Sequence, residues 1–157
     1  MFETILPEEI EQRSFAIIEE ELGEQVLNPV QAPVIKRVIH TTADFDYVEN
    51  LCFSEQAVEK GVRALKDGAC IVTDTEMARA GINKRALARL YELTREGKIS
   101  PELVIGVPVG FVHVVEAKEL FLQSEVPHIV ARGRKGGSNV AAAICNAMLY
   151  LAGGRTL

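Results

Sequence analysis

The sequence predicts an α/β protein in which a mostly parallel sheet lies between two layers of helices. Short, continuous apolar runs, typical of buried parallel strands, alternate along the chain with longer segments of helical periodicity. This alternation favours right-handed crossovers and helices on both faces of the sheet. The chain has 157 residues, 48% of them hydrophobic. That suffices for one core but not for two ordinary domains, so residues 1–157 are predicted to form a single domain.

Three apolar runs are predicted to be strands: residues 70–74 (CIVTD), 102–107 (ELVIGV) and 128–131 (HIVA). Ligands on such sheets collect at the carboxyl ends of the strands. We therefore expect Asp74, the GVPVG turn at residues 106–110 and the GRKGGS turn at residues 133–138 to converge on one edge of the sheet.

The remaining segments predict helices because their apolar residues recur at spacings of three and four. The predicted helices are residues 7–22, 33–44, 55–68, 84–96, 114–123 and 138–151, with a helical turn at residues 75–80. Pro7 suits a first helical turn, while Gly23 and Gly97 suit helix ends.

Composition excludes several classes of protein. Seventeen basic and 22 acidic residues give a net charge of −5, which argues against a general nucleic-acid or anionic-membrane binder. No run approaches the roughly 20 apolar residues of a membrane span, and the start MFETILPEEI lacks a secretion signal, so we expect a cytoplasmic protein. Neither the histidines nor the cysteines have metal-ligand spacing, so no metal is predicted, and Cys52, Cys70 and Cys145 are expected to be buried thiols.

The segment IHTTADFD, residues 39–46, is the densest functional signal. His40 falls in the last turn of a predicted helix, and an imidazole can donate and recover a proton near neutral pH. If the helix continues to Asp44, that carboxylate lies one turn further on and can orient one ring nitrogen of His40. In the alternative interpretation, Asp44 and Asp46 only cap or turn the chain and His40 is a half-buried structural residue.

The segment GRKGGS, residues 133–138, predicts a cradle for an oxyanion. Arg134 and Lys135 supply cations, the amides near Gly136 can approach a ligand closely, and Ser138 is predicted to be the N-cap of the last helix. The spacing of a Walker loop is absent. A simple tight turn explains the glycines equally well.

Together these motifs resemble those of the precorrin-8X methylmutases, in the same order along the chain. The matching segments are PEEIEQRSFAII, IHTTADFDY, FS at residues 53–54, GVRALKDG through CIVTDTEMARAGI, LVIGVPVGFV, EAKE and GRKGGSNVAAAICNA. The similarity covers most of the chain, and IHTTADFD combined with GRKGGS is more specific than either motif alone.

The resemblance implies a flavodoxin-like fold, a homodimer and an isomerase of cobalamin biosynthesis. This enzyme would move a methyl group from carbon eleven to carbon twelve of precorrin-8X or cobalt-precorrin-8. It implies that His40 is the acid that protonates the tetrapyrrole, and that no redox cofactor is required. The carboxylate-fringed ring would be bound by cations, amides and small residues of the matching segments, with Asp44 orienting His40. These substrate-binding residues are Ser14, Arg37, Asp74, Gly110, Arg134, Lys135, Gly136 and Ser138.

The chain departs from the family pattern at one place. Family members carry several tens of further residues, including a strand and a helix, where Ile82 here runs directly into Asn83. Either the protein is a shortened relative with a smaller sheet, or the sequence omits a stretch that the protein carries. Two alternative functions stay open: a catalytically silent tetrapyrrole-binding paralogue, and a small module for another anionic ligand that depends on GRKGGS alone.

Overall fold

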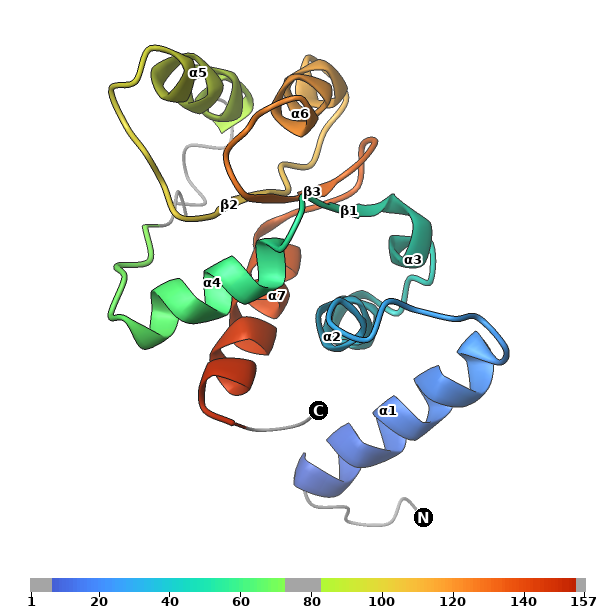
Figure 1. Ribbon diagram of the computed structural model, residues 1–157. Helices are drawn as coiled ribbons and strands as arrows, with labels where there is room; N and C mark the ends of the chain where they lie inside the picture. The colour runs from blue at the N-terminus through green and yellow to red at the C-terminus, as the bar shows by residue number, and fades with distance from the viewer. Residues whose placement is uncertain (1–6, 73–82, 155–157) are drawn as a thin grey trace.

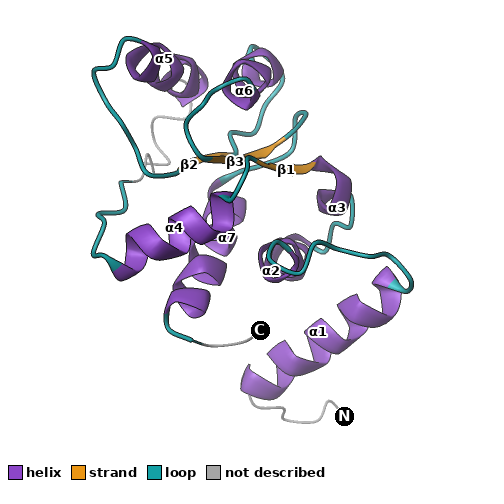
Figure 2. Cartoon of the chain, in the orientation of Figure 1, coloured by secondary structure: helices purple, strands orange, loops and turns teal. Residues whose placement is uncertain are grey.

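The computed structural model describes residues 7–72 and 83–154, which form helices around one small sheet (Figure 1). In chain order the elements are α1 Pro7–Leu22, α2 Ala32–Thr42, α3 Tyr47–Asn50, β1 Leu51–Phe53, α4 Ala57–Lys66, α5 Asn83–Arg95, β2 Val104–Gly106, α6 Val114–Leu122, β3 His128–Ala131 and α7 Ser138–Ala152. Helices predominate over strands (Figure 2).

The sheet has three strands in the order β1-β3-β2. β2 runs parallel to β3, whereas β1 runs antiparallel to it, with Leu51 opposite Ala131. The prediction of a mostly parallel sheet was therefore wrong for one of the two strand pairs. The sheet is mixed because β1 follows α2 and α3 directly and enters the sheet from the opposite end.

Helices lie on both sides of this sheet, with α5 and α6 on one side and α2, α4 and α7 on the other (Figure 1). The side chains of β3 alternate between the two sides, as expected for a central strand. Ile129 and Ala131 join the larger core with residues of α2, α4 and α7, while Val130 packs with Leu87 of α5 and Phe121 of α6. The fold is thus a mixed α/β arrangement of helices around a small sheet.

Two of the three predicted strands are present. Residues 128–131 form β3, all four of them buried, and β2 lies within the predicted run 102–107. The third prediction was wrong for residues 70–72, which pair with no strand of the described residues. Ile71 is 46% exposed and Val72 is 91% exposed. Asp74 and the helical turn predicted at residues 75–80 lie outside the described residues.

The six long helices were predicted within a few residues of their bounds, and α1 begins and ends as predicted. The short elements α3 and β1 were not predicted, because three or four residues are too few to show a periodicity. No helix in the described ranges is both long and apolar enough to cross a bilayer. Cys70 is exposed, contrary to prediction, while Cys52 and Cys145 are partly buried.

Candidate active site

The antiparallel direction of β1 brings the two main motifs together. β2 and β3 are parallel, so the loops that follow them leave the same edge of the sheet. β1 begins at this edge because its first residue, Leu51, pairs with the last residue of β3, Ala131. The amide of Arg132 also donates to the carbonyl of Asn50 at 2.7 Å. The segment IHTTADFD, which leads into β1, therefore lies beside the GRKGGS turn.

Lys135 links the two motifs directly. Its ammonium donates to Asp44 Oδ2 and to Asp46 Oδ2, each at 2.6 Å. The hydrogen bond from Lys135 lowers the pKa of Asp44, and the two carboxylates raise the pKa of Lys135. Residues about ninety positions apart in the sequence thus form one ion-pair network at the edge of the sheet.

His40 lies in the last turn of α2, as predicted, and is partly exposed. Its ring stacks on Phe15 of α1, with centroids 5.3 Å apart and an angle of 20° between the planes. The predicted contact between Asp44 and His40 requires the helix to continue to Asp44. It does not, because α2 ends at Thr42 and Ala43 adopts a left-handed conformation. The oxygens of Asp44 accept from Lys135 and from the amide of Asp46 instead. Aromatic stacking orients His40 in place of the predicted carboxylate.

Arg37 lies one turn before His40 and is the most unusual cation near the site. Arg37 is only 7% exposed, and its guanidinium carbon lies 5.0 Å from the ring centroid of Phe15 and 4.9 Å from that of Tyr150. Nη1 pairs with Glu11 at 2.5 Å. Nε and Nη2 are buried without a hydrogen-bond partner in the part of the chain that the structure describes. A buried donor without a partner is costly, so Arg37 is suited to bind an additional acceptor.

The GRKGGS turn packs against the loop that follows β2. The amide of Gly137 donates to Val107 O at 2.8 Å, and the amide of Gly110 donates to Arg134 O at 3.2 Å. A Cβ at Gly136 would overlap the carbonyl oxygen of Val107, so only glycine fits there. The two loops predicted to converge are therefore in contact.

The exposed surface of these loops combines a cation with apolar side chains. The guanidinium of Arg134 lies 5.3 Å from the ring centroid of Phe111, which is 79% exposed. Val109 and Val112 on the same loop are 58% and 57% exposed. Apolar groups of this kind suit the face of a flat ring, and the cation suits a carboxylate at its rim.

Lys118 of α6 was missed by sequence reasoning, although it lies in the EAKE segment. Its relative exposure is 0%, and its ammonium donates to Gly133 O at 2.9 Å and to Lys135 O at 2.7 Å. Burial lowers the pKa of Lys118 to about 8. The only available signal was a lysine among the apolar positions of a predicted helix, which sequence alone does not distinguish from a surface residue.

The other predicted site residues are less directly engaged. The hydroxyl of Ser14 donates to Ile10 O at 2.8 Å within α1. Ser138 is exposed and is the first residue of α7, while Gly137 holds the N-cap position, so the N-cap prediction was wrong. Gly137 takes this place because it already turns the chain at a φ of 125°. Asp74 lies outside the described residues.

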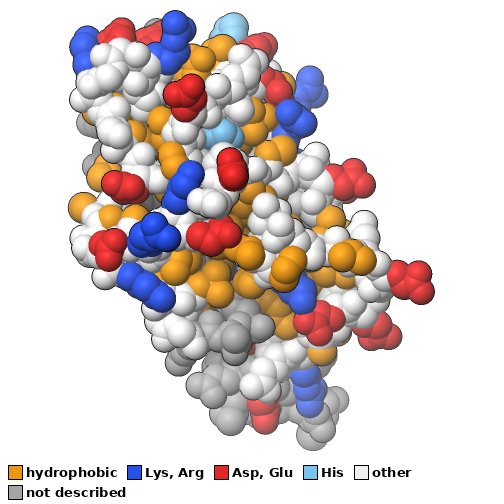
Figure 3. All heavy atoms as spheres, in the orientation of Figure 1, with side chains coloured by type: hydrophobic (Ala, Val, Ile, Leu, Met, Phe, Trp, Pro, Cys, Tyr) orange, Lys and Arg blue, Asp and Glu red, His pale blue; other side chains and the backbone are white. Residues whose placement is uncertain are grey.

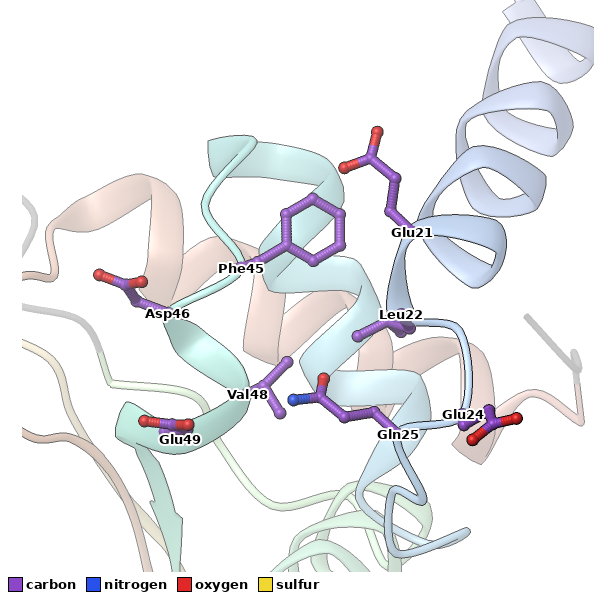
Figure 4. Close-up of a pocket in the computed structure, with 8 residues that line it drawn as sticks. All are labelled: Glu21, Leu22, Glu24, Gln25, Phe45, Asp46, Val48 and Glu49. Carbon is purple, nitrogen blue, oxygen red and sulfur yellow. The ribbon is translucent and has the colours of Figure 1, made fainter.

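A separate pocket of about 670 Å³ lies between the end of α1 and the corner from α2 to α3 (Figure 4). Four carboxylates line it, namely Glu21, Glu24, Asp46 and Glu49, together with Leu22, Gln25, Phe45 and Val48. With no cation among its lining residues, it is unsuited to an anionic ligand. On the face shown in Figure 3, acidic and basic side chains are interspersed. The described residues contain no group of three side chains able to hold a metal ion.

Comparisons with known proteins identify relatives of the chain. The family model described as precorrin-8X methylmutase matches residues 9–91 and 84–151. The cobalt-precorrin-8 methylmutase of Salmonella typhimurium is 38% identical, covering 92% of this chain and 95% of the relative. That of Priestia megaterium is 32% identical, covering 95% and 90%. The solved precorrin-8X methylmutase of Thermus thermophilus matches with a TM-score of 0.85 and 34% identity, covering 95% of this chain and 98% of its own.

The same comparisons locate a difference in length. The alignment with the Salmonella typhimurium relative spans 199 positions, which exceeds the 157 residues of this chain by 42. That alignment therefore contains at least 42 positions without a counterpart here. The two parts of the family match overlap at residues 84–91, next to the junction of Ile82 and Asn83 where the sequence predicted a missing stretch.

Proposed function

This chain belongs to the precorrin-8X methylmutase family, and from that premise we propose that His40 is the general acid with which it isomerises its tetrapyrrole substrate. The enzyme is a methylmutase of cobalamin biosynthesis. The reaction we assign moves a methyl group from carbon eleven to carbon twelve of precorrin-8X or cobalt-precorrin-8. The observation that carries the proposal is the Lys135 bridge to Asp44 and Asp46, because it joins the His40 segment to the loop suited to bind carboxylates.

In the proposed reaction the protein supplies a proton and an orientation. The imidazolium of His40 donates a proton to the conjugated ring, which favours migration of the methyl group with its bonding electrons. Loss of a proton from the rearranged ring then restores neutrality and returns the imidazole to its charged form. The migrating group and the π electrons belong to the substrate, so no electron acceptor enters the balance. A positioned acid of this kind contributes about 10²-fold to 10⁴-fold.

The proposed binding surface consists of the loops after β2 and β3 and the end of α2. Arg134, Lys135 and the amide of Gly136 would bind carboxylates of the ring, and the unused donors of Arg37 would bind another near His40. Gly110, Phe111 and their apolar neighbours would face the ring. Ser14, Asp74 and Ser138 complete the proposed substrate contacts.

Three further features belong to this proposal. We propose a homodimer, since an open sheet edge favours a partner, and a cytoplasmic location. We also propose that the helix layers on both faces of the sheet are a reduced form of the flavodoxin-like arrangement.

The test is turnover of purified protein with precorrin-8X and, separately, with cobalt-precorrin-8, followed by the absorbance of the corrin product. His40→Ala should lower kcat by about 10²-fold to 10⁴-fold, the amount that a general acid contributes. Lys98→Met is the control because it changes an exposed side chain, paired with Glu96, that lies outside the proposed binding surface. This control should keep its activity.

Each outcome has a definite meaning. Formation of the product by the wild-type protein and by Lys98→Met, with loss in His40→Ala, supports the proposal. Equal rates for His40→Ala and wild type would exclude His40 as the acid. Tight binding of the corrin product without turnover of either substrate would instead identify a catalytically silent tetrapyrrole-binding paralogue.

A further inference from the structure

We propose that Lys118 is a positioning residue that aims two amides of the Gly133–Gly137 turn at the ligand. Its buried ammonium holds the inner carbonyls of the turn, which directs the amides of Arg134 and Gly136 outward. The nature of the ligand, a carboxylate of the tetrapyrrole, rests on the proposed function. The geometry of the turn does not.

The first observation is the environment of Lys118. The side chain is fully buried on α6 beneath the turn, and it forms no ion pair with a carboxylate in the described residues. Its two recorded acceptors are Gly133 O and Lys135 O, which belong to alternate residues of the same turn. The ammonium is therefore committed to the backbone of one loop.

The second observation follows from the geometry of the peptide group. In a trans peptide the C=O and the following N–H point in opposite directions. Since the carbonyls of Gly133 and Lys135 point toward Lys118, the amides of Arg134 and Gly136 point away from it. Neither amide donates a hydrogen bond in the described part of the chain. The two N–H groups are separated by one residue, an arrangement typical of backbone anion sites.

The opposite side of the turn is also fixed. Gly136 lies against the carbonyls of Val107 and Pro108, and Gly137 donates to Val107 O. The turn is thus held between the ammonium of Lys118 and the loop after β2. With both sides fixed, a ligand meets the amides in one orientation, and little conformational entropy remains to be lost on binding.

The energetic cost of Lys118 argues that its charge has a purpose. A buried ammonium loses its hydration, and its lowered pKa reflects that loss. A methionine of similar length would fill the same space without this cost. The charge also lies behind two peptide groups whose N–H ends face outward, so it strengthens the attraction of the turn for an anion.

The first test separates substrate binding from chemistry with Lys118→Met, Lys118→Gln and the control Lys98→Met. Lys98 is an exposed lysine that pairs with Glu96, so its removal changes the net charge equally. Lys118→Met should raise KM by about 10-fold to 100-fold, the range for hydrogen bonds to charged groups, and leave kcat within about threefold. Lys118→Gln, which keeps a donor, should recover part of the loss, and Lys98→Met should match wild type.

The second test needs no substrate and so distinguishes failure of this inference from failure of the proposed function. In Lys118→Met the backbone amide resonances of residues 133–137 should shift or broaden in an NMR spectrum, while those of α4 stay in place. If Lys118→Met does not fold, Lys118→Gln decides both measurements. Unchanged turn resonances, or a KM equal to that of wild type in a folded variant, would overturn the assignment.

Discussion

The segments HIVA at residues 128–131 and CIV at residues 70–72 share the apolar pair Ile-Val, but only the first forms a buried strand. All four residues of the first are buried in β3. In the second, Ile71 is 46% exposed and Val72 is 91% exposed, and no described strand pairs with it. The comparison teaches that an apolar, β-branched run becomes a strand only where neighbouring strands accept its backbone hydrogen bonds and other elements bury its side chains.

The neighbours of the two segments explain the difference. β3 has β1 on one side and β2 on the other, and helices cover both of its faces. The segment at residues 70–72 lies shortly before residues 84–91, where the two parts of the family match overlap. At least 42 aligned positions of the Salmonella typhimurium relative have no counterpart in this chain. Among the described residues, Ile71 and Val72 therefore have no strand to pair with.

The largest effect should come from removing the same side chain in the two segments. Ile129→Ala leaves a cavity beneath a fully buried position and should lower the free energy of unfolding by about 2–5 kcal/mol. Ile71→Ala acts on a side chain that is nearly half exposed and should cost less than about 1 kcal/mol. Urea unfolding followed by circular dichroism measures both. Equal costs would show that residues 70–72 are buried in solution.

A glycine pair extends the comparison to the turns beside these segments. Gly136 has a φ of 153° and faces the carbonyls of Val107 and Pro108, so Gly136→Ala should cost about 2–3 kcal/mol through overlap and strain. Gly68 has a φ of 84° but open space around the position of a Cβ. Gly68→Ala should therefore cost only about 1 kcal/mol, from backbone strain alone. The midpoints of urea unfolding give the difference.

Binding of the corrin product gives a second measurement on Gly136→Ala. If Gly136→Ala unfolds at the same urea concentration as Gly68→Ala, the contact between the two loops is looser than the structure indicates. If Gly136→Ala is as stable as Gly68→Ala but binds the corrin product less tightly than wild type, the amide of Gly136 contributes to ligand binding.

Helical periodicity was sufficient to predict the six long helices, and continuous apolar runs predicted β2 and β3. Helices of nine or more residues repeat their apolar positions often enough to show their type and, within a few residues, their ends. β1 could not be predicted this way, since Leu51–Phe53 is too short and its pairing with β3 depends on residues far along the chain. The antiparallel direction of this one strand decides where His40 lies.

For the candidate site, the sequence predicted where His40 lies on its helix but not which side chain it contacts. His40 lies in the last turn of its helix as predicted, but its neighbour is Phe15 rather than Asp44. Spacing along a helix predicts contacts within that helix, whereas Phe15 comes from another one. Lys118 was missed for the same reason, because its burial results from the packing of α6 against the turn.

The smallest expected effect concerns the ion pair that joins the two motifs beside β3. Lys135 lowers the pKa of Asp44 in the folded protein, so the carboxylate stabilises the fold at neutral pH and loses this contribution as the pH falls below its ordinary pKa of 3.8. Both partners are partly exposed, so the stabilisation should not exceed about 1 kcal/mol. Asp44→Asn should therefore be less stable than wild type near pH 7, and the difference should shrink toward about pH 3. In a Lys135→Met background the same substitution should have a smaller pH-dependent effect on urea unfolding, because only the amide of Asp46 still lowers the pKa of Asp44. An effect of equal size there would mean that the amide of Asp46, and not Lys135, lowers the pKa of Asp44.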